Sequence, residues 1–277
     1  MAIGEADERR YPLKRPKNHK VPVPRWTLKM PEGVTHTYTL YLGVQTHGQD
    51  LDAASTAEQS IQRWLDEPEN RPTAIDTFRV TNGFDIVNSK VWVAYWTDSD
   101  CFNNKLQTLD LKQVWNDLGD SKRSTGIWAE HFVTAVERLE TNYSSLLHKP
   151  GVSQVPGSEF PEHTLTAYWG AGRDRLPASA NDLFLAPDVT PLPKEQPKGV
   201  GERLTGRSYD NMCHIRSGQW WPQADEVERE AYESELQVKL MHGMQYLWDN
   251  PEETGTLGLR FLQNLDENGG HQIARKK

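Results

Sequence analysis

The stretch Lys90-Val91-Trp92-Val93-Ala94-Tyr95-Trp96 decides the fold class, because both of its alternating sets of side chains are apolar. Successive side chains of a strand point to opposite faces, and a strand that is apolar on both sets is buried on both faces. The sequence therefore predicts a central strand over residues 90–96, with packing on each side of it.

Regular elements are also predicted on both sides of this strand. Runs of β-branched and aromatic residues favour strands, and apolar residues at helical spacing favour helices. They predict strands over residues 36–47, 77–84 and 126–136, a helix over 53–66, and a helix in two pieces over 98–118. The resulting order, β-α-β-β-α-β, is the ferredoxin-like split pattern.

A similar order is predicted again later in the chain. Its elements are a strand over residues 163–169, a short helix over 179–185, a hairpin of 201–207 with 211–217, a helix over 222–248 and a closing strand over 257–265. We therefore expect an α+β fold of two ferredoxin-like halves, whose sheets pack face to face into an α+β barrel.

Composition shifts predict the domain boundaries. The expected parts are a basic, proline-rich arm (1–30), a first half (31–148), a linker dense in Pro and Gly (149–162), a second half (163–266) and an atypical tail (267–277). The arm is expected to lie extended on the domain surface, and contact with an acidic partner is the alternative. The proline-rich residues 187–199 are a surface loop or a lid.

The overall composition excludes several classes of protein. The chain has 277 residues, of which 36% are hydrophobic and 25% charged, and its net charge is −8. This charge argues against a general nucleic-acid binder. Its two cysteines lack zinc spacing, no apolar run reaches membrane-spanning length, and the first ten residues do not form a secretory signal. We expect a cytoplasmic protein that does not associate with membranes.

Ser217 is a candidate site residue at the end of the strand predicted over residues 211–217. Alternation places Cys213, Ile215 and Ser217 on one face of that strand. A serine at the end of an apolar row can present a hydrogen-bond donor to a dry pocket. Alternatively, Ser217 begins the turn to Gly218 and bonds only to the backbone.

Two charged groups are further candidates. Arg175 can orient a polar substrate with its rigid set of donors, or it can form a surface salt bridge. Glu140, with Glu137, can take part in acid–base chemistry if it is buried, or it can be a solvated helix charge. The scattered histidines lack metal-ligand spacing, so no residue is assigned as a metal ligand: His47, His131, His163, His214 and His242.

Two short blocks carry a family resemblance: Tyr168-Trp169-Gly170-Ala171-Gly172-Arg173-Asp174-Arg175-Leu176-Pro177 and Asp210-Asn211-Met212-Cys213-His214-Ile215-Arg216-Ser217-Gly218-Gln219. Other pieces agree with them in order and spacing, among them Tyr41-Leu42-Gly43-Val44-Gln45, Glu140-Thr141-Asn142-Tyr143 and Arg260-Phe261-Leu262-Gln263-Asn264-Leu265-Asp266. From residue 22 to residue 266 the chain resembles the haem-containing aldoxime dehydratases, which convert an aldoxime into a nitrile.

The resemblance implies a dimeric α+β barrel with one haem b and a small aldoxime substrate. In that family a serine hydrogen-bonds the oxime hydroxyl, which corresponds to Ser217 here. An arginine positions the substrate oxygen, which corresponds to Arg175. A glutamate assists the catalytic histidine, which corresponds to Glu140.

The chain departs from the family pattern after Asp266. The family continues to a histidine that binds the haem iron and then to a histidine that acts as the acid. His271 comes too early for the first of these, so we expect a C-terminally shortened member without an identified axial ligand. Two other hypotheses stay open beside an active dehydratase. One is a non-catalytic remnant that binds haem or a small molecule, and the other is a peroxidase-like or dismutase-like haem barrel protein.

Overall fold

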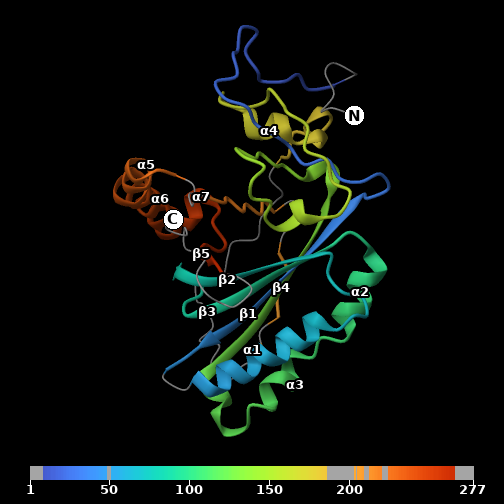
Figure 1. Ribbon diagram of the computed structural model, residues 1–277, viewed down its shortest axis with the longest axis vertical. Helices are drawn as coiled ribbons and strands as arrows, with labels where there is room; N and C mark the ends of the chain where they lie inside the picture. The colour runs from blue at the N-terminus through green and yellow to red at the C-terminus, as the bar shows by residue number, and fades with distance from the viewer. Residues whose placement is uncertain are drawn as a thin grey trace.

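The computed structural model describes residues 9–48, 51–185, 203, 205–208, 212–219 and 224–265. Its centre is a five-stranded antiparallel sheet with the strand order β4-β1-β3-β2-β5 (Figure 1). The strands are β1 His36–Thr46, β2 Ala74–Gly83, β3 Ser89–Trp96, β4 Thr125–Ala135 and β5 Arg260–Asn264. The chain therefore has a mixed α and β fold built on an antiparallel sheet.

The central strand is confirmed. β3 lies between β1 and β2, and its residues from Val91 to Trp96 are all buried. One alternating set, Trp92, Ala94 and Trp96, joins the core on the helical side of the sheet. The other set, Val91, Val93 and Tyr95, joins a second core on the opposite face. Burial on both faces follows from the two apolar sets of side chains.

Helices cover one face of this sheet, below it in Figure 1. They are α1 Leu51–Asp66, α2 Ser99–Gln107 and α3 Leu111–Asn116. The break between α2 and α3 confirms the helix predicted in two pieces. Each piece starts at an aspartate whose side chain accepts a backbone N–H, Asp98 from Cys101 and Asp110 from Gln113, as N-caps do. The short 3-10 turn η1 Gly119–Ser124 leads from α3 into β4.

The other face of the sheet, which we call the aromatic face, is lined by large rings. Its members include Tyr41, Phe78, Tyr95, Trp128 and Phe132. Trp128 lies flat against Gly43 of the neighbouring strand, since a Cβ added to Gly43 would stand 2.0 Å from Trp128 Cε2. A residue without a side chain is therefore required at position 43.

The strand predicted over residues 163–169 is wrong, because this backbone is irregular apart from an isolated bridge at Glu162. The His163 N–H donates to the Arg25 carbonyl, whereas the Leu165 peptide groups bond to side chains. The Leu165 N–H donates to His163 Nδ1 at 3.1 Å, and the Leu165 carbonyl accepts from Arg175 Nη1 at 2.8 Å. Ala167 has a φ of 60°, in the left-handed region, which no strand adopts. Side-chain hydrogen bonds have replaced a strand ladder here.

The second sheet of the expected barrel is not present among the described residues. Residues 212–217 and the described part of 201–207 are not strands, so the predicted hairpin is wrong there. The strand predicted over 257–265 does form, as β5, but it pairs with β2 of the first sheet. Asn211 and residues 187–199 lie outside the described part of the chain.

The long helix predicted over residues 222–248 is confirmed from Glu226 onward. It consists of α5 Glu226–Ala231, a π-helical turn η5 Tyr232–Leu236 and α6 Gln237–Asp249, followed by α7 Pro251–Thr254. The Asp225 side chain caps α5 by accepting the Glu228 N–H. In place of the helix predicted over 179–185 the chain has α4 Ala171–Arg175 and a 3-10 turn η4 Pro177–Ala180. Two further 3-10 turns are η2 Val136–Arg138 and η3 Gly151–Gln154.

The described part of the N-terminal arm has an irregular backbone, and its first residues lie at the end of the molecule that carries α4 (Figure 1). Its backbone bonds to distant segments: Tyr11 N to Ala180 O, and Trp26 in isolated bridges with Tyr143 and Glu162. None of the described helices is long and apolar enough to span a membrane.

Candidate functional site

Two of the three predicted site residues form an ion pair. Arg175, at the end of α4, donates its Nε–H to Glu140 Oε1, and its Nη1 donates to the Leu165 carbonyl at 2.8 Å. The Arg175 side chain is 12% exposed and that of Glu140 is 34% exposed. Arg175 is therefore held from two sides while the pair still reaches solvent.

The block that contains Glu140 connects three segments of the chain. Thr141 Oγ1 accepts the Leu28 N–H at 2.8 Å, which ties the block to the N-terminal arm. Asn142 Oδ1 lies 3.1 Å from His163 Nε2, which ties it to the segment before α4. The Glu140–Tyr143 block is thus a structural junction as well as the source of the Glu140 carboxylate.

His163 is part of this site, although its isolated position in the sequence did not single it out. Its Nε2 faces Asn142, and its Nδ1 accepts the Leu165 N–H. Burial, followed by the positive charges of Arg175 and Arg25, lowers the pKa of His163. An acceptor role for Nδ1 requires the neutral ring, so the hydrogen bonding and the lowered pKa agree.

Ser217 is exposed and lies on the irregular segment 212–219. The side chains of this segment do alternate, but in the opposite sense to the prediction. Residues 213–219 are all exposed, but the side chains of His214 and Arg216 bond to Tyr41 and Tyr95 of the sheet. The predicted dry, apolar row that ends at Ser217 is therefore wrong, and the Glu140–Arg175 pair forms without Ser217.

Arg216, next to Ser217, anchors this segment to the aromatic face. Its Nη2 lies 2.6 Å from Asp76 Oδ2, its Nη1 donates to Tyr95 OH at 2.5 Å, and its guanidinium lies 4.9 Å from the centre of the Phe78 ring. Burial alone would lower the pKa of Arg216, but Tyr95 and Asp76 outweigh it and the pKa is raised. Arg216 is therefore a permanent cation bound to the sheet.

His214 is the second anchor of the segment. Its Nε2 lies 3.0 Å from Tyr41 OH, and its ring stacks on Phe132 with the two planes 2° apart. Burial lowers the pKa of His214, the nearby Glu130 raises it, and Arg216 lowers it further. The net direction is downward, so the neutral ring is the favoured form.

A third arginine completes the charge pattern of the aromatic face. Arg260, at the start of β5, binds Glu130 with two hydrogen bonds of 2.6 and 2.8 Å. It also binds Asp85 Oδ2 at 2.8 Å, and it lies 4.5 Å from the centre of the Trp128 ring. The cations on this face are thus neutralised by carboxylates of the sheet and its turns.

Tyr143 connects the predicted residues electrostatically. Burial raises the pKa of Tyr143 to about 12, and both Arg216 and Glu140 contribute to the charge around it. Arg216 lowers the pKa of this partly buried phenol, and Glu140 raises it. The E-T-x-Y block indicates from sequence that Tyr143 lies near Glu140. The large sequence separation between residues 143 and 216 concealed the influence of Arg216.

The chain matches known proteins over most of its length. Residues 40–277 match the family model described as haem-containing dehydratase. The aliphatic aldoxime dehydratase of Pseudomonas chlororaphis is 30% identical over 256 residues, which cover 92% of this chain and 72% of the relative. The phenylacetaldoxime dehydratase of Bacillus sp. (strain OxB-1) is 26% identical over 257 residues, which cover 92% of this chain and 71% of the relative.

Solved structures of aldoxime dehydratases share the fold. One superimposes with a TM-score of 0.68 at 23% identity, over 96% of this chain and 75% of the other. A second, in complex with butyraldoxime, gives a TM-score of 0.71 at 22% identity, over 96% and 73% of the two chains. At this identity the structural likeness concerns the fold.

Proposed function

This chain belongs to the haem-containing dehydratase family, and from that premise we propose that it dehydrates aldoximes, R–CH=N–OH, to nitriles and water. The observation that carries the proposal is the family match over residues 40–277, together with relatives named as aldoxime dehydratases. The reaction breaks an N–O bond and removes one proton from carbon, so it is a lyase reaction.

The substrate class is proposed as small aldoximes with either an alkyl or an arylalkyl group. The relatives include enzymes named for aliphatic aldoximes and one named for phenylacetaldoxime. The aromatic face of the sheet offers rings against which both kinds of group can pack.

Haem is the cofactor of the family. A haem requires apolar walls and an axial ligand. The hollow beside α5 is lined by Glu226, Arg229, Glu230, Glu233 and Ser234, which is a polar and mainly acidic set. On the aromatic face, His214 Nε2 is taken by Tyr41, and Arg216 and Arg260 are paired. The described residues do not by themselves form a haem site, so the roles proposed below concern only this chain's own side chains.

Arg175 is proposed to bind the oxime oxygen. Hydroxide is a poor leaving group, and a donor aimed at its oxygen stabilises the charge that develops there. Glu140 holds Nε and the Leu165 carbonyl holds Nη1, which leaves Nη2 as the end that can reach a substrate. Glu140 thereby orients the donor, besides the role toward a catalytic histidine that the resemblance implies.

Ser217 is proposed to donate a second hydrogen bond to the oxime hydroxyl. His214 and Arg216 fix the backbone just before it to the sheet. A Ser217→Ala chain that formed nitrile at the wild-type rate would remove Ser217 from the proposal. The general acid that protonates the leaving hydroxyl is not identified among the described side chains.

The finer architecture is proposed as well. The β-α-β-β-α-β order of residues 36–135, with the strand order β4-β1-β3-β2, supports a ferredoxin-like first half within the boundaries 31–148. We propose a homodimeric barrel and a cytoplasmic location from the family resemblance. Light scattering after size-exclusion chromatography tests the dimer.

A direct assay tests the function. The purified chain is supplied with haem, reduced under nitrogen, and given phenylacetaldoxime or butyraldoxime, and nitrile is quantified by gas chromatography. Nitrile above the level of free haem supports the proposal. Bound haem without nitrile would contradict it in favour of a binding remnant, and peroxide-dependent dye oxidation without nitrile would favour a peroxidase-like protein.

A further inference from the structure

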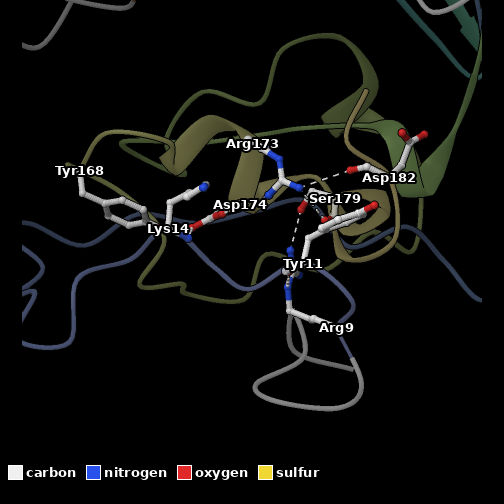
Figure 2. A network of polar contacts seen from close by, with 8 residues as sticks. All are labelled: Arg9, Tyr11, Lys14, Tyr168, Arg173, Asp174, Ser179 and Asp182. Carbon is white, nitrogen blue, oxygen red and sulfur yellow. Dashed lines mark hydrogen bonds and ion pairs between the residues drawn. The ribbon is translucent and has the colours of Figure 1, made fainter. Parts of the chain in front are cut away.

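The N-terminal arm is bound by the block that contains Arg175 (Figure 2). Arg9 Nη2 donates to Ser179 Oγ at 2.7 Å, and the Lys14 backbone N–H donates to Asp174 Oδ2 at 2.7 Å. Arg15 Nη1 donates to Thr164 Oγ1 at 2.6 Å. Residues 9–15 therefore bond to three points of the segment from residue 164 to residue 179.

Asp174 is the buried centre of this contact. Its side chain is 0% exposed, and its Oδ2 accepts both the Lys14 N–H and the Tyr168 hydroxyl at 2.8 Å. Its Oδ1 has no hydrogen bond but forms an ion pair of 3.9 Å with Arg173 Nη1, which is likewise buried without a hydrogen bond. A buried carboxylate is costly unless it is hydrogen-bonded, and the arm and Tyr168 supply the hydrogen bonds that the ion pair with Arg173 lacks.

The chain is shaped to let the arm approach. Gly170 has a φ of 92°, which favours glycine, and a Cβ at this position would stand 2.9 Å from Lys14 Cβ. Ala167 also has a positive φ, and the two residues bracket Tyr168, whose hydroxyl turns back to Asp174. Left-handed conformations at residues other than glycine are held only where their surroundings enforce them.

Two of the arm contacts lie one residue away from Arg175 and from Leu165, which is one of the two residues that anchor Arg175. Thr164, bonded to Arg15, precedes Leu165, whose carbonyl accepts from Arg175 Nη1. Asp174, bonded to Lys14, precedes Arg175 itself. A shift of the arm would therefore move the guanidinium and one of its two acceptors together.

We infer that Asp174 is a positioning residue for Arg175, and that residues 9–15 act with it as a brace that fixes the Arg175 guanidinium beside Glu140. The inference rests on the proposed function, because Arg175 matters for catalysis only if it binds substrate. It gives the basic arm a role inside the molecule in place of an acidic partner.

The test compares Asp174→Asn and Tyr168→Phe with Lys17→Ala. Lys17 is an exposed cation of the same arm, so Lys17→Ala removes charge without touching the brace. Two readouts do not need activity. The first is hydrogen exchange of the Lys14 amide, and the second is the ¹⁵N-resolved Nε–H resonance of Arg175, identified by its loss in Arg175→Lys.

We expect faster Lys14 exchange and a shifted or lost Arg175 resonance in both brace variants, and no change of either in Lys17→Ala. Nitrile formation should show a kcat lowered on the order of tenfold with little change in KM, because a misplaced donor loses stabilisation of the leaving oxygen. Tyr168→Phe removes only one hydroxyl. If Asp174→Asn fails to fold, the Lys14 exchange and the Arg175 resonance can still be measured in Tyr168→Phe.

Two results would overturn the inference. One is a brace variant whose Lys14 amide exchanges faster while the Arg175 resonance stays in place. The other is an Asp174→Asn protein in which both signals are unchanged. A wild-type chain that makes no nitrile would refute the proposed function alone, since the two spectroscopic signals would still report on the brace.

Discussion

The sheet and the segment from residue 140 to residue 182 are stabilised in different ways. In the sheet, two apolar cores meet on β3, and most of the buried side chains are hydrocarbon or aromatic. In the 140–182 segment the buried groups include His163, Thr166, Asp174 and Ser179. Apolar burial is not directional, whereas a polar network holds its members at defined distances and angles. The first region supplies stability, and the second places the side chains of the candidate site.

Replacing a tryptophan in each region should show this difference most strongly. Trp92 on β3 is 0% exposed, whereas Trp169 in the second region is 99% exposed. We expect Trp92→Ala to lower the free energy of unfolding by about 3–5 kcal/mol, the usual cost of a large core cavity. Trp169→Ala should leave it nearly unchanged. Urea unfolding followed by circular dichroism measures both, and equal losses would refute the division into two regions.

Gly43 tests packing inside the sheet at a single atom. In Gly43→Ala the new Cβ would meet the Trp128 ring, so Trp128 must move and Arg260 loses the ring beneath it. Overpacking of this kind costs about 1–3 kcal/mol. The matched control is Gly243→Ala in α6, where a Cβ meets nothing within 4 Å. There we expect a gain of about 0.5–1 kcal/mol, since alanine favours the helix over glycine. A stable Gly43→Ala protein would show that Trp128 does not depend on position 43.

His163 tests the polar region through pH. Its pKa is lowered in the folded chain, so between that value and its unfolded value near 6.5 the unfolded state binds more protons. The contribution of neutral His163 is therefore fully present above about pH 7 and is lost as the pH falls through 6.5 toward the folded pKa. Urea midpoints measured from pH 7.5 down to pH 5.5 should fall less in His163→Gln than in wild type. Identical slopes would mean that His163 is free to protonate in the folded protein.

The smallest effect is expected at the Lys29–Glu159 pair, which joins the arm to the second region. The two side chains are 41% and 66% exposed, and solvent and salt screen such pairs. Lys29→Ala should shift the urea midpoint by no more than the experimental error, with or without 0.5 M salt. A clear loss that disappears at high salt would show that surface charge holds the arm, and not the buried contact at Asp174.

The comparison also explains which features the sequence could predict. Strands and helices between residues 36 and 135 were predicted because apolar residues such as Trp92 and Ile61 recur with the period of their element. Residues 163–169 contain β-branched and aromatic residues too, but the Leu165 peptide groups bond to His163 and Arg175. Hydrogen bonds of this kind leave no periodic pattern in the sequence. The side-chain alternation of residues 213–217 was predicted, yet its direction was not, because the partners of His214 and Arg216 lie on strands far away in sequence.

For the site itself, the motif block predicted that Arg175 matters, and the structure pairs it with Glu140. The block could not predict His163 as a neighbour of that pair, since His163 is placed by tertiary contacts. Nor could it predict that Tyr168, Gly170 and Asp174 of the same block receive the N-terminal arm. The sequence of this block would look the same whether these residues contact substrate or bind another part of the chain.

The pairing of β5 with β2 has a consequence for synthesis of the chain. Thr81 bonds to Phe261, 180 residues later, so β5 cannot pair with the outer edge of β2 until residues 260–264 have been made. At a synthesis rate of about 5–20 residues per second, the wait is on the order of ten to forty seconds. An unpaired edge is a template for association with other chains. During this interval the β2 edge of one nascent chain can pair with a chain on a neighbouring ribosome of the same message, which would lower the yield of folded protein. A chaperone that covers the β2 edge would prevent this association.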